Sequence, residues 1–193
     1  PFRPEEIYLC SMDKPLTDQV ALITGAGQGV GQGIAYGLAK RGVRIIAVGR
    51  TLEKCEGTIA TIKERFGTDG AAIRCDIGVI ADLDDLVTSA ANQFGRLDIL
   101  VNNAVSAQIT PLLDASIEEF ELGLRVGPVA SLKLMQLVQP HLVTAGGGNI
   151  INLAPSAAMR WDSSNYGVYA AEKEAIRALT RAAANEWGGL GIR

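Results

Sequence analysis

The sequence has 193 residues, 48% of them hydrophobic, which is enough for one domain with a sizeable core and excludes a disordered chain. A net charge of -3 without any basic run argues against binding to nucleic acid or to an anionic membrane. The three cysteines are scattered without CxxC spacing, so neither a disulfide framework nor a zinc site is expected, and a reducing, cytoplasmic setting is favoured.

Residues 1–16 are predicted to form a flexible N-terminal extension. This segment lacks the apolar core of a secretion signal, and no later apolar run is long enough to cross a bilayer. Residues 17–193 are predicted to form a single domain.

From Gln19 onward, short apolar runs alternate with longer helical stretches. Strands are predicted at 20–24, 43–49, 71–76, 97–103 and 149–154, and helices at 34–40, 52–66, 80–94, 117–138 and 168–187. The strands are apolar almost throughout, as expected of a parallel sheet covered by helices on both faces. The pattern predicts an α/β fold with a doubly wound parallel sheet in three α/β/α layers. GGLGIR ends the sequence where another strand is expected, so the sheet is predicted to lack C-terminal strands, through truncation or natural shortness.

A glycine-rich stretch, TGAGQGVGQGIA, follows the first strand directly and opens a helix. Glycines permit a tight turn in which backbone N–H groups approach a pyrophosphate, whose charge the helix N-terminus stabilises. The spacing TGxxxGxG fits, with Gly25, Gly29 and Gly31, whereas strict GxGxxG does not. A P-loop of NTPases is excluded because no GK[ST] follows. The context predicts a dinucleotide site, against the alternative of a turn without a ligand.

The ends of the second and third strands bear on the choice of dinucleotide. Arg50 stands where an acid would bind the ribose 2′-hydroxyl of NAD, and an arginine there can bind the 2′-phosphate of NADP. NADP is therefore favoured over NAD, although Arg50 could also be a solvated residue. Asp76 ends the third strand, where it could accept a hydrogen bond from adenine or, about as readily, cap the following turn.

The stretch NYGVYAAEK contains two tyrosines and one lysine in a predicted helix. Tyr169 and Lys173 are four residues apart and so lie on one face, whereas Tyr166 is two turns from the lysine. A cation near a phenol lowers its pKa, which makes Tyr169 a plausible acid or base near neutral pH. Glu172 points elsewhere on the helix and is predicted to be solvated.

A third polar group is needed to hold the substrate oxygen, and Ser156, just beyond the fifth strand, is the candidate; the alternative is an ordinary turn serine. The lone His141 and the absence of a GxSxG elbow make a Ser-His-Asp hydrolase improbable.

These motifs together resemble the short-chain dehydrogenase/reductase family from about Leu16 to the last residue. They are TGxxxGxG, NNA at residues 102–104, Ser156, and YxxxK at residues 169–173. The resemblance implies a Rossmann-type sheet, hydride exchange between a nicotinamide cofactor and a carbonyl or secondary alcohol, and a homodimer or homotetramer. It also implies that Tyr169 is the acid/base, that Lys173 lowers the pKa of Tyr169 and binds the nicotinamide ribose, and that Ser156 orients the substrate oxygen. The residues predicted to bind the cofactor are Gly25, Gln28, Gly29, Val30, Gly31, Arg50, Asp76, Ile77, Asn103, Tyr169 and Lys173.

Two positions depart from the family pattern. Val105 replaces the glycine of the NNAG motif, and Gly127 stands where the family has its catalytic asparagine. The family is thought to use the backbone carbonyl of that asparagine to hold a relay water, and glycine keeps a carbonyl. Pro128 cannot donate to the carbonyl of Leu124 and should bend the helix.

Two functions are therefore considered. The first is an NADP-dependent oxidoreductase acting on a small-molecule ketone or secondary alcohol. The second is a regulatory or scaffolding relative that binds the dinucleotide without useful turnover. The missing asparagine and the altered NNAG motif favour the second, whereas intact Ser156, Tyr169 and Lys173 favour the first.

Overall fold

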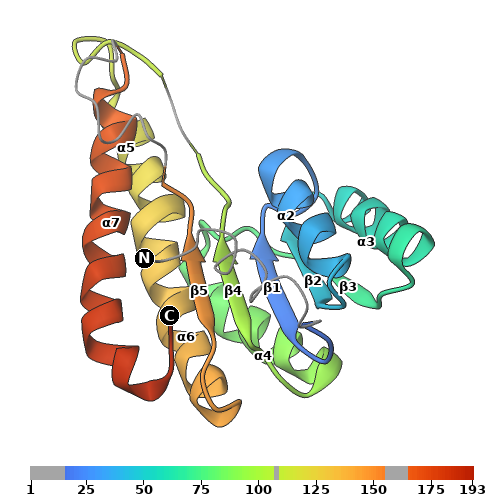
Figure 1. The fold of residues 1–193 in the computed structure, drawn as a ribbon. Coiled ribbons are helices and arrows are strands. Elements are labelled where there is room, and N and C mark those ends of the chain that lie inside the picture. The colour runs from blue at the N-terminus through green and yellow to red at the C-terminus, as the bar shows by residue number, and fades with distance from the viewer. Residues whose placement is uncertain (1–15, 107–108, 155–164) are drawn as a thin grey trace, which may run out of the picture.

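The computed structural model describes residues 16–106, 109–154 and 165–193. A parallel five-stranded sheet forms its centre, in the order β3-β2-β1-β4-β5 (Figure 1). The strands are β1 (Val20–Thr24), β2 (Arg44–Gly49), β3 (Gly70–Arg74), β4 (Ile99–Asn102) and β5 (Asn149–Asn152). The strand order reverses between β1 and β4, as in a doubly wound Rossmann-type fold, so the predicted fold class is confirmed.

Helices cover both faces of the sheet (Figure 1). They are α2 (Gly29–Ala39), α3 (Leu52–Phe66), α4 (Leu83–Phe94), α5 (Ile117–Leu124), α6 (Ala130–Thr144) and α7 (Gly167–Trp187), with short 3-10 turns at Ile80–Asp82 and Gly188–Leu190. One core lies between the sheet and α2 and α3, and the other between the sheet and α4 and α6, with the end of α7 packed against it. None of the described helices is both long and apolar enough to cross a membrane.

Burial differs between the central and the outer strands. Every residue of β1 and β4 is buried, and only the end residues of β2 are not. The outer strands β3 and β5 contain only half-buried and exposed residues. The expectation that all strands are covered on both faces is therefore correct for the centre and wrong at the edges, because the buried strand residues of the two cores come from β1, β2 and β4.

Polar side chains join β1 to β4 at both ends. At the start, the buried carboxylate of Asp98 accepts the Val20 N–H at 2.9 Å and is paired with Arg96 at 2.6 Å. At the end, the buried Thr24 hydroxyl accepts the N–H groups of Asn103 and Ala104, both at 3.0 Å. These contacts fix how the turn after β1 lies beside the segment after β4.

The long helical region after β4 is interrupted at Pro128. A π-helical turn, η2 (Arg125–Val129), separates α5 from α6 and contains this proline. Proline has no N–H to donate, so the regular i to i−4 pattern cannot continue through it. The predicted irregularity is confirmed as a widened turn.

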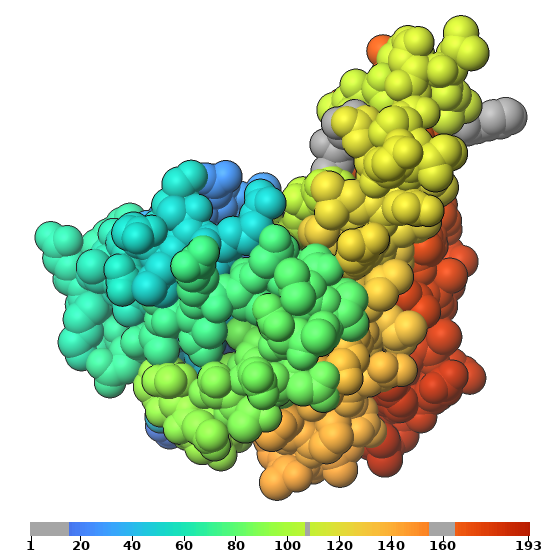
Figure 2. Space-filling view, turned by 180° about the vertical axis from the view of Figure 1, so that it is seen from behind, coloured from blue at the N-terminus to red at the C-terminus, as the bar shows by residue number. Residues whose placement is uncertain are grey.

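Residues 109–116, which precede α5, project above the body of the molecule, as the yellow-green surface in Figure 2 shows. This segment is tied to the beginning of α7, because the Thr110 N–H donates to the Asn165 carbonyl at 3.0 Å. The Leu112 side chain lies against Gly167, and Leu113 is 95% exposed.

Candidate active site

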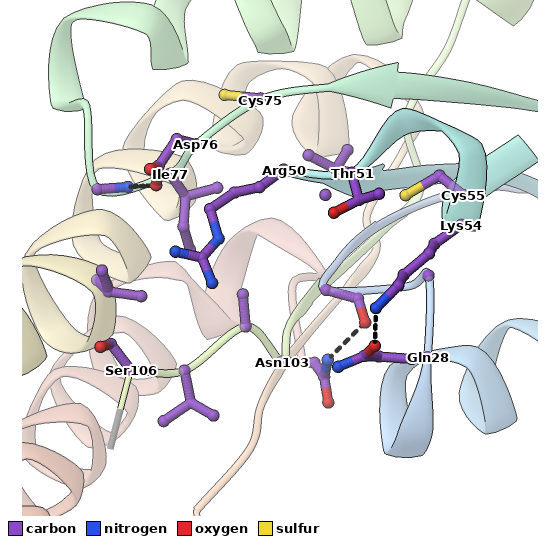
Figure 3. Close-up of a pocket in the computed structure, with 18 of the residues that line it drawn as sticks. Gln28, Arg50, Thr51, Lys54, Cys55, Cys75, Asp76, Ile77, Asn103 and Ser106 are labelled. Carbon is purple, nitrogen blue, oxygen red and sulfur yellow. Dashed lines mark hydrogen bonds between the residues drawn. The ribbon is translucent and has the colours of Figure 1, made fainter. Parts of the chain in front are cut away.

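The carboxyl ends of the parallel strands meet at one edge of the sheet and surround a cavity of about 590 Å³ (Figure 3). Its walls come from the glycine-rich turn after β1, the ends of β2 and β3, the segment after β4, and the junction of α5 with η2. The cavity lies where the strand order reverses, which is the usual place for a ligand in an open α/β sheet.

Among the residues predicted to bind the cofactor, those lining this cavity are Gly25, Gln28, Gly29, Val30, Arg50, Asp76, Ile77 and Asn103. Gly31, also predicted, lies behind the turn: a Cβ there would collide with the carbonyl of Gly25 and the amide of Asn103. Gly25 has a φ of 67°, a conformation that favours glycine. The close turn that the motif predicted is therefore formed.

The Asn103 side chain stabilises the glycine-rich turn after β1. Its Nδ2 donates to the carbonyl of Thr24 at 2.9 Å and to that of Gly25 at 3.3 Å. Its amide group is therefore engaged with the protein backbone as well as placed at the cavity wall.

Arg50 extends from the end of β2 into the cavity in Figure 3. Its side chain is exposed and has no ion pair within the described part of the chain. An unpaired guanidinium is free to bind an incoming anion. The Asp76 carboxylate, by contrast, accepts the Gly78 N–H at 3.0 Å, the contact expected of a residue that caps a turn.

Lys54 was not identified from the sequence. It lies in the first turn of α3, lines the cavity, and donates from Nζ to Gln28 Oε1 at 2.7 Å (Figure 3). Its position at the start of the helix that follows β2, four residues after Arg50, could have indicated a second cation near the same strand end.

Tyr169 and Lys173 lie on α7, next to the end of β5. Lys173 is 4% exposed, and its ammonium donates to the Leu153 carbonyl at 2.9 Å and lies 5.8 Å from the centre of the Tyr169 ring. The predicted pairing on one helix face is therefore present, although neither residue lines the cavity of 590 Å³. The Tyr166 ring lies 6.1 Å from that of Tyr169. Ser156, the third predicted catalytic residue, lies outside the described residues.

The ionisation of this pair differs from the expectation. Burial, followed by the charge of Glu172 and then Tyr166, raises the pKa of Tyr169, whereas Lys173 was expected to lower it. Burial lowers the pKa of Lys173, and Glu172 partly opposes this change. Among the described residues, the arrangement keeps Tyr169 protonated at neutral pH.

The prediction that Glu172 is solvated is wrong. Its side chain is only 2% exposed, and burial raises its pKa to about 7 against the opposing charge of Lys173. Adjacent residues on a helix point in different directions, but here both directions lead into the protein because α5 and η2 pack against α7.

The two departures from the family pattern lie on either side of the site. Val105 is 47% exposed and lines the cavity. Gly127 is buried in η2, and a Cβ there would lie 3.8 Å from Ile176 of α7, an ordinary contact distance.

A sequence model of a protein family, described as short chain dehydrogenase, matches residues 19–193. The chain belongs to this family. D-threitol dehydrogenase of Mycolicibacterium smegmatis is 34% identical to this short chain dehydrogenase over 184 residues, which cover 94% of the chain and 69% of the relative. The family and the class of enzyme predicted from the sequence, an oxidoreductase acting on CH–OH groups, are thereby confirmed.

Solved structures of the family show the same fold. A metagenomic short-chain oxidoreductase in complex with NADP superposes with a TM-score of 0.87 at 28% identity, covering 93% of this chain and 80% of that one. NAD⁺-bound xylitol dehydrogenase superposes with a TM-score of 0.86 at 29% identity, covering 92% of this chain and 68% of that one.

Proposed function

We propose that this dehydrogenase transfers a hydride between NADP(H) and a carbonyl compound or secondary alcohol, with Tyr169 as the acid/base, assisted by Lys173 and Ser156. The observation that carries the proposal is the buried Lys173 ammonium, which the Leu153 carbonyl holds one helical turn from a half-buried phenol. A binding protein without turnover needs no such pair. Relatives of this chain are named as dehydrogenases and reductases, which supports the enzyme over the non-catalytic alternative that Val105 and Gly127 favour.

The cavity at the edge of the sheet fits a nicotinamide dinucleotide, because its wall is a glycine-rich turn that packs closely against Asn103 only while position 31 has no side chain. When bound, that cofactor supplies the hydride or accepts it. The N-terminus of α2 would stabilise the pyrophosphate, Asp76 and Ile77 would contact the adenine end, and Lys173 would bind the nicotinamide ribose.

The proposed preference for NADP over NAD depends on two cationic side chains at the cavity. Arg50 is unpaired in the described part of the chain, and Lys54 is held by a neutral partner, Gln28. Both can bind a 2′-phosphate without breaking an ion pair. The neighbours in complex with NADP and with NAD⁺ support either dinucleotide, so the proposal depends on these two side chains.

Arg50→Ala should weaken NADP⁺ binding about 10- to 100-fold, the effect of losing a hydrogen bond between charged groups, and leave NAD⁺ binding nearly unchanged. Isothermal titration with both cofactors measures this difference. Arg74→Ala, which removes the arginine at the end of β3 outside the cavity, is the matched control. Equal weakening of both cofactors by Arg50→Ala would contradict the assignment.

The raised pKa of Tyr169 suits a proton donor. A phenol that stays protonated at neutral pH can give its proton to the oxygen of a carbonyl substrate as that oxygen becomes an alkoxide. The nearby ammonium of Lys173 then stabilises the phenolate that remains. In the opposite direction, the phenolate takes the proton of a secondary alcohol.

Tyr169→Phe should lower turnover by about 100-fold or more, since general acid/base catalysis contributes about 10²- to 10⁴-fold. Oxidation of NADPH is followed by absorbance with a panel of ketones, and oxidation of alcohols with NADP⁺. Tyr166→Phe is the matched control, because it removes the neighbouring hydroxyl from the same stretch of chain. Equal rates in wild type and Tyr169→Phe would remove Tyr169 from the mechanism.

Assembly as a homodimer or homotetramer and a cytoplasmic location stay predictions from the sequence.

A further inference from the structure

Glu172 is a buried carboxyl group for which the proposed reaction has no role. Its side chain is only 2% exposed, and it lies against α5 at Gly123. A Cβ added to Gly123 would overlap the carboxyl group of Glu172. The two residues are therefore complementary: the acid is accommodated because position 123 has no side chain.

The contact joins two elements that carry different parts of the site. Gly123 is the penultimate residue of α5, directly before Leu124 and the π-helical turn. Glu172 lies on α7, three residues after Tyr169 and directly before Lys173. The contact between Gly123 and Glu172 therefore joins α5 to the helix that carries both proposed catalytic groups.

Several titratable or charged groups belong to the elements that meet at this contact. On α7 they are Tyr169 and Lys173. On α5, Glu119 lies one turn before Gly123 and so on the same face, and Arg125 of η2 follows two residues after Gly123. The charge of Glu172 raises the pKa of Tyr169 and also raises that of Lys173. An ionised Glu172 thus opposes loss of the phenol proton and supports the ammonium.

We propose that Glu172, seated in the slot left by Gly123, is a positioning residue that fixes α7 against α5 and whose ionisation controls the protonation of Tyr169 and Lys173. The catalytic consequence rests on the function proposed for Tyr169, but the packing and the electrostatic link do not. Burial raises the pKa of Glu172 to about 7, so its charge changes with pH in the neutral range. Below that pH a neutral Glu172 makes Tyr169 easier to deprotonate, and above it the ionised carboxylate makes deprotonation harder.

The packing is tested by substitutions at both positions. Gly123→Ala should lower the melting temperature because the new methyl group displaces the carboxyl group, and Glu172→Ala in the same chain should restore most of the loss. Gly57→Ala is the control, since a Cβ at this helical glycine of α3 meets no atom within 4 Å. If the double variant is as unstable as Gly123→Ala alone, the proposed packing of Glu172 against Gly123 is refuted.

The electrostatic link is tested by Glu172→Gln, which keeps the shape and removes the charge. Carbon-13 NMR of ring-labelled tyrosine, with Tyr169→Phe to assign the signal, follows Tyr169 directly without substrate or cofactor. The wild-type signal should show an inflection near pH 7 that is absent from Glu172→Gln, and the phenol should lose its proton at a pH lower by about half a unit or more in the variant. Identical titration curves would overturn the proposal.

Turnover measured against pH separates this proposal from the proposed function. If Tyr169 is the acid/base, the acidic limb of alcohol oxidation should move to lower pH in Glu172→Gln, whereas a merely structural change would leave its position unaltered. If Tyr169→Phe keeps full activity, the proposed function fails, and the NMR titration still decides the role of Glu172.

Discussion

Replacing Thr24 by valine tests the bond between the glycine-rich turn and the segment after β4. The Thr24 hydroxyl accepts the N–H groups of Asn103 and Ala104 at 3.0 Å and donates to the Val101 carbonyl at 3.3 Å. Valine fills the same space and can neither accept nor donate, so two backbone donors lose their partner. At about 1–3 kcal/mol for each unsatisfied donor, with both residues half-buried, the free energy of unfolding should fall by about 2–4 kcal/mol. For a domain of this size the melting temperature should fall by about 5–15 °C.

Thr24→Ser is the matched control, because serine keeps the hydroxyl and loses only a methyl group, at a cost of about 1 kcal/mol. Differential scanning calorimetry and urea unfolding of the two variants measure the difference. Since Asn103 also supports the carbonyl of Gly25, Thr24→Val should weaken dinucleotide binding as well. Equal stability of the valine and serine variants would refute the reasoning that the hydroxyl holds the two segments together.

Gly31→Ala should reduce dinucleotide affinity at least about tenfold, because its methyl group would displace the carbonyl of Gly25 and the amide of Asn103. Gly33→Ala on the same helix should bind normally, since a Cβ there meets nothing within 4 Å; equal loss in both variants, measured by titration calorimetry, would contradict this account. Glu172 has a folded pKa of about 7, raised from an ordinary value of 4.5, so its carboxyl group costs stability as pH rises through that interval. The amide of Glu172→Gln has no such cost, so its stability relative to wild type should increase by about 2–3 kcal/mol between about pH 5 and about pH 8, as urea unfolding at the two pH values would show.

Much of the fold follows from local patterns. The predicted strand at 20–24 and the helix at 52–66 coincide with β1 and α3, and most other elements differ at their ends. The helix predicted at 117–138 is instead divided into α5, the π-helical turn η2 and α6. Apolar runs between glycine-rich turns specify buried parallel strands because few other structures can bury them. The exposure of β3 and β5 was not predicted, since it depends on which strands lie at the edge and not on the composition of each strand.

The candidate site was predicted in part. The glycine-rich turn and the pairing of Tyr169 with Lys173 depend on spacing within one element, which the sequence displays directly. The burial of Glu172 depends on Gly123, 49 residues earlier on another helix, so no local pattern could indicate it. The direction of the Tyr169 pKa shift was missed for the same reason: it depends on burial by neighbouring elements, which a helix considered alone does not reveal.

The side chains of Asp98 and Thr24 form hydrogen bonds to the backbone at opposite ends of the pair β1 and β4. Sliding either strand by a single residue would break both contacts together and move every side chain of that strand from the core on one face of the sheet to the core on the other face. These contacts thus fix β1 and β4 relative to each other. Mutations in the projecting segment after β4 can therefore reshape the surface near Tyr169 while the dinucleotide cavity keeps its form, which would let substrate preference diverge without rebuilding the cofactor site.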